Sequence, residues 1–251
     1  MRITLFGANG PTGRLLTAQS LAAGHEVTVL TRHPADFPLR GERLRVVGGD
    51  VLDPAPVQDA IRGADAVLST LGVPFGKTPV QVYSRGAERI LEAMTRADVA
   101  RFVTVTSSAV TGEDEPSGGW LFNRVLQPYV TKKLGKTVYD DMRRMEDLLA
   151  DSDADWTVLR PSGLYDLPVV TAYSLTAEHG PGRFTARVDL ADALLGQVDD
   201  RRFVRGVAHV ITLADNPSLL SMLLREARPK KPSRAPAIPA ASHDNPAVGA
   251  Q

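Results

Sequence analysis

Three glycines near the start of the chain have the spacing with which a backbone can bind a pyrophosphate. Gly7, Gly10 and Gly13 form a G-x-x-G-x-x-G pattern between an apolar run at residues 3–6 and a helix-forming run. Such glycines allow a sharp turn, a close approach of the phosphate and tight packing of the helix on the strand, while the helix N-terminus attracts the anion. The pattern therefore predicts a dinucleotide site, with an ordinary strand-to-helix turn as the alternative.

The ends of the next two predicted strands carry residues that would recognise the adenosine half of such a ligand. Arg32 follows the strand expected at residues 27–30, where a carboxylate would bind the ribose 2′-hydroxyl of NAD and an arginine can pair with the 2′-phosphate of NADP. Asp50 follows the strand expected at residues 44–47 and is placed to accept a hydrogen bond from the adenine amino group. Arg32 therefore favours NADP(H). A solvent-exposed arginine and a turn aspartate are the alternatives.

The composition excludes several other kinds of site. The chain of 251 residues has 29 basic and 29 acidic side chains, so no net field attracts nucleic acid or an anionic membrane. It contains no cysteine, which excludes disulfides and thiolate catalysis, and its five histidines form no cluster typical of a metal site. A hydrolase elbow of the form G-x-S-x-G is also absent from the sequence.

The length and the apolar runs indicate where such a protein would work. A chain of this size is typical of one α/β domain with a modest appendage. No apolar run approaches the roughly 20 residues that span a bilayer, and the first strand begins directly after Met1, which leaves no room for a signal peptide. We therefore expect a cytoplasmic protein that acts on a small molecule, with no nucleic-acid or membrane partner.

Apolar runs typical of buried strands alternate with amphipathic helical stretches along most of the chain. Helices are expected at residues 80–97 and from Asp189, as an N-cap, to about residue 198. This alternation predicts an α/β fold: a doubly wound (Rossmann) domain with a mostly parallel sheet and one ligand-binding edge. The expected strands are residues 3–6, 27–30, 44–47, 66–72, 102–106, 156–159, 172–176 and 207–213.

Two segments stand apart from this single domain, which is expected to span residues 1–228. Residues 113–136 join a polar loop to an apolar stretch that resembles a lid over a planar substrate; a dimer contact or an ordinary packed insertion is the alternative. Residues 218–227 are expected to form a last short helix. Residues 229–251 are rich in proline, alanine and small polar residues without a periodic apolar face, which predicts a disordered tail.

Five motifs carry a resemblance to a known family. They are G-A-N-G-P-T-G at 7–13, E-V-T-V-L-T-R at 26–32, V-G-G-D-V at 47–51, T-S at 106–107 and W-T-V-L-R-P at 156–161. Together they resemble the atypical short-chain dehydrogenases with an NAD(P)H-binding domain, and within them the biliverdin reductase B and flavin reductase group, which is NmrA-like. The resemblance covers about residues 2–212.

This resemblance implies that NADP(H) lies across the glycine turn with its nicotinamide toward the end of the fifth strand. The cofactor supplies the hydride chemistry, and the protein orients it. The contacts implied are Gly7, Asn9, Gly10, Pro11, Thr12 and Gly13 for the pyrophosphate, Arg32 for the 2′-phosphate, Asp50 and Val51 for the adenine, Leu71 and Gly72 for the ribose, Ser107 for the nicotinamide end, and Pro161 and Ser162 beneath the nicotinamide.

The candidate catalytic residues depart from the pattern of ordinary short-chain dehydrogenases. Those enzymes use Tyr-x-x-x-Lys, in which the lysine lowers the pKa of the tyrosine so that it can donate a proton. Tyr129 and Lys133 match this spacing but lie in the insertion. The helix that aligns with the catalytic one carries Tyr139 and Arg143 instead, and arginine cannot take the part of the lysine. Ser107 is the stronger candidate, with a strand-end hydroxyl that binds backbone or cofactor as the alternative.

These features predict an NADPH-dependent reductase that transfers hydride to a planar conjugated acceptor such as a flavin or a quinone. A conjugated acceptor needs less acid help than an isolated carbonyl, which suits a site without a placed Tyr-Lys pair. The flavin and bilin reductases of the group carry a histidine where this chain has Gly163, which leaves the substrate open. Two alternatives are a non-catalytic NADP(H)-binding redox sensor of NmrA-like type, and a carbonyl reductase or epimerase that uses Tyr129 or Tyr139. The oligomeric state is also left open.

Overall fold

The computed structural model describes residues 1–76, 78–111, 135–180 and 182–214. Tyr129, Lys133, the helix predicted at 218–227, the predicted tail and all but the last two residues of the lid-like insertion lie outside the described residues. Within the described residues, no helix combines the length and the apolar character that crossing a bilayer requires.

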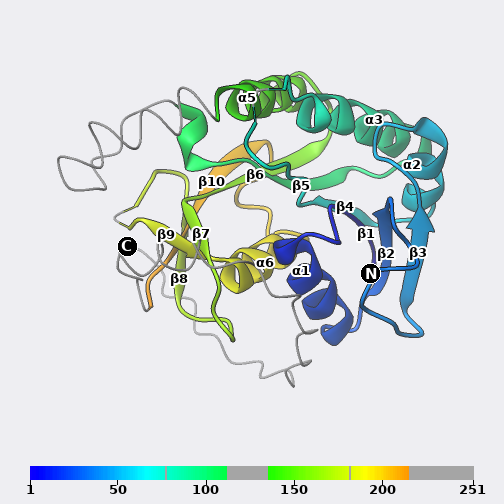
Figure 1. The fold of residues 1–251 in the computed structure, drawn as a ribbon, viewed down its shortest axis with the longest axis horizontal. Coiled ribbons are helices and arrows are strands. Elements are labelled where there is room, and N and C mark those ends of the chain that lie inside the picture. The colour runs from blue at the N-terminus through cyan, green and yellow to red at the C-terminus, as the bar shows by residue number, and fades with distance from the viewer. Residues whose placement is uncertain (77, 112–134, 181, 215–251) are drawn as a thin grey trace.

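An eight-stranded, mostly parallel sheet forms the middle layer of the molecule (Figure 1). Its strand order is β3-β2-β1-β4-β5-β6-β10-β8, and β8 pairs antiparallel with β10 while the other pairs are parallel. The prediction of a doubly wound, mostly parallel sheet is thereby confirmed. Its strands are β1 (Arg2–Phe6), β2 (Glu26–Thr31), β3 (Leu44–Gly48), β4 (Ala66–Ser69), β5 (Arg101–Val105), β6 (Asp155–Pro161), β8 (Tyr173–Thr176) and β10 (Gly206–Thr212).

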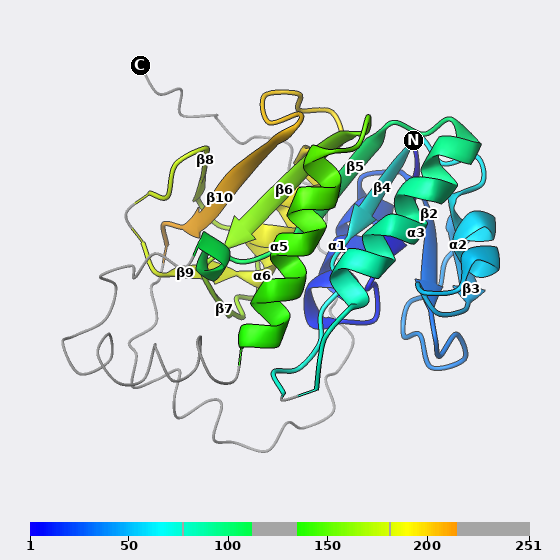
Figure 2. The ribbon, with the colours of Figure 1, turned by 90° about the horizontal axis from the view of Figure 1, so that it is seen from above.

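Helices cover both faces of this sheet, as Figure 1 shows and Figure 2 repeats from above. One face carries α1 (Pro11–Ala22) and α6 (Arg187–Gly196), and the other carries α2 (Pro54–Ile61), α3 (Val82–Ala97) and α5 (Lys136–Ala150). The chain leaves β1 toward β2 and β3 on one side and returns to β4 on the other side of β1. The connections after β1 and β4 therefore run in opposite directions along the sheet, which leaves a crevice at the carboxyl ends of these two strands. Folds of this kind bind ligands in that crevice.

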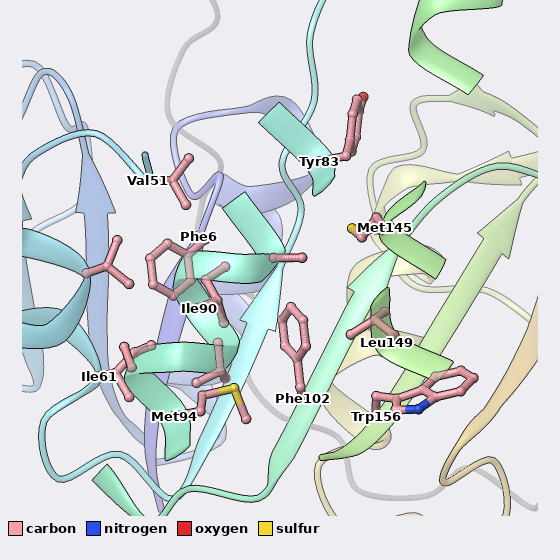
Figure 3. Packing of buried hydrophobic residues seen from close by; sticks show 14 of the residues in the cluster. Phe6, Val51, Ile61, Tyr83, Ile90, Met94, Phe102, Met145, Leu149 and Trp156 are labelled. Carbon is pink, nitrogen blue, oxygen red and sulfur yellow. The ribbon is translucent and has the colours of Figure 1, made fainter. Parts of the chain in front are cut away.

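Alternating strand side chains fill the two layers between the sheet and its helices. In β1, Ile3 and Leu5 are buried in the layer under α1 and α6, whereas Phe6 is buried in the layer under α2, α3 and α5. Figure 3 shows this second layer, in which Ile90 of α3 and Phe102 of β5 lie beside one another near Phe6. Because both faces are covered, the parallel strands read as near-continuous apolar runs in the sequence, and this is why they could be predicted.

Short strands and strand ends depart from the prediction. A second, two-stranded parallel sheet pairs β7 (Gly163–Tyr165) with β9 (Phe184–Ala186), and neither strand was predicted. Three residues are too few to show a period of two, which explains the omission. The prediction of a strand to residue 72 was also wrong, because β4 ends at Ser69. Likewise α3 begins at Val82 rather than at residue 80.

The prediction that Asp189 caps a helix was wrong. Helix α6 begins at Arg187, with Ala186 in the N-cap position. The fully buried carboxylate of Asp189 instead accepts hydrogen bonds from the backbone N–H of Thr171 at 2.7 Å and from its hydroxyl at 2.9 Å. The hydroxyl of Thr212 donates to it as well, at 2.7 Å. Asp189 therefore joins α6 to β10 and to the segment before β8, because a buried carboxylate needs such partners.

Candidate functional site

The glycine turn after β1 brings three backbone segments into contact. Gly7 has a φ of +74°, and a Cβ atom there would lie 2.5 Å from the carbonyl of Thr70 at the end of β4. A Cβ atom on Gly13 would lie 2.3 Å from the carbonyl oxygen of Gly7. The N–H of Gly10 donates to the carbonyl of Gly7 at 3.0 Å and closes the turn. Only glycine fits at Gly7 and Gly13, because α1 starts directly against the ends of β1 and β4.

The first turn of α1 is built to face an anion. Pro11 occupies the first turn, and the N–H of Arg14 already donates to the carbonyl of Gly10. Helix geometry leaves the N–H groups of Thr12 and Gly13 without an intrahelical acceptor, at the positive end of the helix dipole. The guanidinium of Arg14 holds the side-chain oxygen of Asn9 at 2.7 and 3.1 Å, which adds a positive charge beside the turn. This cradle fits a pyrophosphate.

A cavity of about 670 Å³ extends from the glycine turn across the carboxyl ends of the neighbouring strands. A volume of this size is in the range of cofactor sites. It lies over the crevice between β1 and β4 at which the strand order reverses, as the fold requires. The predicted contact residues that line it are Gly7, Asn9, Gly10, Pro11, Thr12, Gly13, Arg32, Asp50, Val51, Leu71 and Gly72.

Three predicted contacts are absent from the described lining of this cavity. Ser107, Pro161 and Ser162 do not line it, although Thr106 and Leu164, their near neighbours in the chain, do. Other residues that line the cavity were not predicted as contacts, although Leu30, Thr31, Gly49 and Thr106 lie within the quoted motifs. They are Phe6, Leu30, Thr31, His33, Gly49, Leu52, Thr70, Val73, Pro74, Val82, Tyr83, Val105, Thr106, Met142, Leu164, Arg187 and Leu190.

The two ends of the cavity differ in chemistry. At the end of β2, Arg32 and His33 are exposed and line the cavity together. Asp50 lies nearby, where its carboxylate accepts a hydrogen bond from the N–H of Leu52 at 3.0 Å. The opposite end, toward β5, is lined by the apolar side chain of Val105 and by Thr106, which carries a hydroxyl. A ligand that fills the cavity would therefore carry negative charge at one end and a flat apolar group at the other.

The arrangement agrees with a comparison against known families. A family model described as NAD(P)H-binding matches residues 7–201. The chain belongs to this NAD(P)H-binding family. The match begins at the first glycine of the turn and extends past α6, so it covers every lining residue of the cavity except Phe6. It confirms the NAD(P)H-binding domain that the resemblance of the sequence motifs implied.

Curated relatives of this NAD(P)H-binding chain share parts of its sequence. An uncharacterized protein of Mycobacterium tuberculosis is 33% identical over 108 residues, which is 43% of this chain and 12% of that protein. A (4-alkanoyl-5-oxo-2,5-dihydrofuran-3-yl)methyl phosphate reductase of Streptomyces griseus is 29% identical over 202 residues, which is 79% of this chain and 59% of that protein. The chain thus spans only part of the length of these relatives.

Solved structures share the fold of the NAD(P)H-binding chain. A short-chain dehydrogenase/reductase of Veillonella parvula in complex with NADP is 22% identical and aligns with a TM-score of 0.70 over 85% of this chain and 95% of that one. ChuY, an anaerobillin reductase from Escherichia coli O157:H7, is 20% identical, with a TM-score of 0.67 over 87% of this chain and 100% of that one. At such identities the likeness shows the fold alone.

Ser107 contacts Tyr139 near the β5 end of the cavity. Burial raises the pKa of the Tyr139 phenol, and a hydrogen bond with the Ser107 hydroxyl acts in the opposite direction. The Tyr139 ring also contacts that of Phe75, with centroids 5.8 Å apart. One turn further along α5, Arg143 donates to the carbonyl of Val110 at 2.8 Å and to Asp140 at 2.7 Å. The fold therefore places Ser107 beside Tyr139, whereas the Arg143 guanidinium binds Val110 and Asp140 instead of the tyrosine.

A pair of histidines lies near the end of β6, where His209 of β10 is the strand partner of Arg160. Nε2 of His179 lies 3.1 Å from the hydroxyl of Ser162, and the His179 ring meets that of His209 edge to face, with centroids 5.1 Å apart. Burial, followed by the nearby His179 and Arg160, lowers the pKa of His209 from 6.5 to about 4, although Glu146 acts in the opposite direction. His209 is therefore neutral in the folded protein near neutral pH.

Protonation of His209 makes the stability depend on pH. The unfolded chain binds a proton at His209 below about pH 6.5 and the folded protein only below about pH 4. The free energy of unfolding is therefore expected to fall as the pH is lowered through this window, with about 3 kcal/mol of the fall due to His209. Urea unfolding of the protein and of His209→Gln across this window measures the difference. Equal pH dependence in the two proteins would contradict this assignment.

Proposed function

We propose that this chain is an NADPH-dependent reductase that transfers hydride to a planar conjugated acceptor. The observation that carries the proposal is one continuous cavity that joins a pyrophosphate cradle, an arginine at the end of β2 and an apolar end at β5. Arg32 stands where an NAD-selective domain would place a carboxylate. The apolar end suits a flat ring stacked on a nicotinamide.

Two similar proteins support the choice of acceptor. The relative of Streptomyces griseus is named as a reductase of an oxo-dihydrofuran that carries an alkanoyl group and a phosphate. ChuY, which shares the fold, is described as an anaerobillin reductase. Both names describe reduction, and the dihydrofuran ring is a compact unsaturated system next to carbonyl groups. We therefore favour acceptors in which a double bond is conjugated to a carbonyl, together with flavins and quinones.

In the proposed reductase, different residues would bind the cofactor and shield the acceptor from water. Thr12 and Gly13 would hold the pyrophosphate through backbone N–H groups, and Arg32 would bind the 2′-phosphate. When bound, NADPH supplies a hydride from C4 of its nicotinamide. Apolar side chains such as Val105 and Leu164 would exclude water from the face on which the acceptor lies.

Turnover with defined acceptors tests this function. NADPH consumption is followed by absorbance with FMN, menadione and an α,β-unsaturated γ-lactone, in protein already shown to bind NADPH. Acceptor-dependent consumption that prefers NADPH over NADH is expected. Tight NADPH binding without consumption for any of the three acceptors would instead favour a redox sensor that binds NADP(H) without catalysis.

Reversing the charge at Arg32 is expected to change the cofactor preference. In Arg32→Glu, the affinity for NADPH should fall about 30-fold relative to that for NADH, because a charge-assisted bond to the 2′-phosphate is lost and repulsion replaces it. Binding is measured by calorimetry with both cofactors. Arg62→Glu makes the same charge change at an exposed position after α2, outside the cavity, and should leave the ratio unchanged. An unchanged ratio in Arg32→Glu would show that Arg32 does not read the 2′-phosphate.

The contact between Ser107 and Tyr139 supports a carbonyl reductase as a second candidate. In that case Tyr139 would donate the proton to a carbonyl oxygen, and Tyr139→Phe is expected to lower kcat about 100-fold with a carbonyl substrate. For the proposed conjugated acceptors, the same variant should retain kcat within about threefold, because they need less acid help. Steady-state rates of Tyr139→Phe with menadione and with a simple aldehyde distinguish a carbonyl reductase from a reductase of conjugated acceptors.

A further inference from the structure

Arg187 is a cationic side chain of the cavity that has no part in the proposed contacts with NADPH. It is the first residue of α6 and lines the cavity directly after β9. The other charged lining residues, Arg32 and Asp50, follow β2 and β3, where they would meet the adenosine half of the cofactor. Among the described residues that line the cavity, Arg187 is therefore the one charged side chain that lies away from the adenosine end.

The position of Arg187 is on the half of the sheet where the acceptor would bind. Figure 1 shows β7 and β9 on the side of β6 and β10, away from β2 and β3. Arg187 directly follows β9, which pairs with β7 along its length. Two leucines near it also line the cavity, Leu164 in β7 and Leu190 about one turn further along α6. Arg187 thus lies beside the apolar side chains that would shield the acceptor from water.

The guanidinium of Arg187 is held in place but retains free donors. One of its N–H groups donates to Asp166 at 2.8 Å, which is its only hydrogen bond to any residue that the structure describes. A guanidinium has five N–H donors. The side chain of Arg187 is 25% exposed and that of Asp166 is 77% exposed, so water largely screens the counter-ion. The other donors of Arg187 can therefore bind an anion inside the cavity.

The stability of α6 does not explain an arginine at its first residue. The helix dipole is positive at this end and disfavours a cation there. Asp189, the acidic residue in the same turn, is bound by Thr171 and Thr212. An ion pair with an exposed partner such as Asp166 also contributes little to stability. An anion in the cavity would supply the negative charge that the fold itself does not place beside Arg187.

We propose that Arg187 binds an anionic group, a phosphate or a carboxylate, that the acceptor carries. The inference rests on the proposed reductase function and narrows its acceptors to planar conjugated molecules with such a group. A guanidinium can bind either oxyanion through two parallel N–H···O bonds. The phosphates of NADPH already have partners in this proposal, since the glycine turn faces the pyrophosphate and Arg32 the 2′-phosphate. Because Arg187 would hold the acceptor in the ground state and the transition state alike, its loss should raise KM and leave kcat unchanged.

FMN and riboflavin test this assignment, because they share the flavin ring and differ by one phosphate. Each is titrated into the full chain saturated with NADP⁺, and flavin fluorescence gives the dissociation constant. FMN is expected to bind about 30-fold more tightly than riboflavin, because it gains a charge-assisted bond to the guanidinium. In Arg187→Gln this preference should disappear through weaker binding of FMN. The dissociation constants of riboflavin and of NADPH, the latter from calorimetry, should stay within about twofold.

Two further variants serve as controls. Arg187→Lys keeps the positive charge without the planar fork, so it should keep part of the preference for FMN. Arg183 is exposed, lies in the segment before β9 and does not line the cavity. Arg183→Gln makes the same substitution as the test variant and should retain the full preference.

The outcomes separate the anion site from the reductase function. Equal binding of FMN and riboflavin by the unmodified protein, or a preference that survives in Arg187→Gln, would overturn the assignment. Loss of NADPH affinity in Arg187→Gln with an unchanged preference for FMN would show that Arg187 binds the cofactor pyrophosphate, which would also overturn it. The titrations need no turnover, so they decide the anion site even if the protein binds NADPH but consumes none with any acceptor. That last result would contradict the proposed reductase function alone.

Discussion

Gly13→Ala is expected to weaken NADPH binding at least 100-fold. The added methyl group would lie 2.3 Å from the carbonyl oxygen of Gly7 and 2.7 Å from the Cα atom of Ala8. Both are backbone atoms next to a buried strand, so the start of α1 has to move away from β1 and carries the N–H groups of the cradle with it. Forced contacts of this kind typically cost about 1 to 3 kcal/mol of stability. Calorimetric titration with NADPH and urea unfolding measure both effects.

Gly196→Ala is the matched control for that substitution. Gly196 is the last residue of α6, and a Cβ atom there meets nothing within 4 Å. The change should leave NADPH binding unaffected and alter the stability by no more than about 1 kcal/mol, since alanine favours helix. Undiminished NADPH binding in Gly13→Ala would contradict the placement of the pyrophosphate at this turn.

Asp141→Ala is expected to destabilise the protein by about 3 kcal/mol. The fully buried carboxylate of Asp141, on α5, accepts hydrogen bonds from the N–H of Tyr83 at 2.9 Å and from the hydroxyl of Ser84 at 2.5 Å. Both donors lie in the first turn of α3, whose own N-cap residue, Gln81, provides no side-chain cap. Asp141 thus caps a helix from a neighbouring one, and its removal leaves buried donors without partners.

Asp140→Ala is the matched control on the same helix. Asp140 pairs with Lys136 and Arg143 at 2.7 Å each, but its side chain is 31% exposed, so its loss should cost less than about 1 kcal/mol. Urea unfolding of the two variants gives the comparison. NADPH affinity should also fall in Asp141→Ala, because Tyr83 lines the cavity. Equal losses of stability in the two variants would contradict the capping role of Asp141.

The sequence was most informative where one short stretch determines its own geometry. The glycine pattern predicts a turn in which only glycine fits at positions 7 and 13. The structure places this turn at the crevice of the sheet. The parallel strands were predictable for a related reason, since a strand buried on both faces is apolar along most of its length. Arg32 lines the cavity because the end of a strand fixes its position.

The features of the fold and the site that were not predicted depend on contacts between distant segments. No local sequence pattern encodes such contacts. Asp189 reads as a helix cap, but its partners Thr171 and Thr212 come from other segments. His179 and Ser162 lie 3.1 Å apart before β9 and β7 respectively, two strands that are too short to predict. Neither partnership could be predicted, because a single aspartate or histidine has no periodic signature.

Transfer of deuterium from NADPH tests the central claim most directly. The protein is incubated with the α,β-unsaturated γ-lactone and NADPH deuterated at one or the other C4 position, and the product is analysed by mass spectrometry and NMR. A cavity that holds one face of the nicotinamide against the acceptor predicts deuterium in the product, at the carbon β to the carbonyl, from one of the two labelled cofactors only. Lactone product that carries no deuterium from either cofactor would contradict direct hydride transfer at this site.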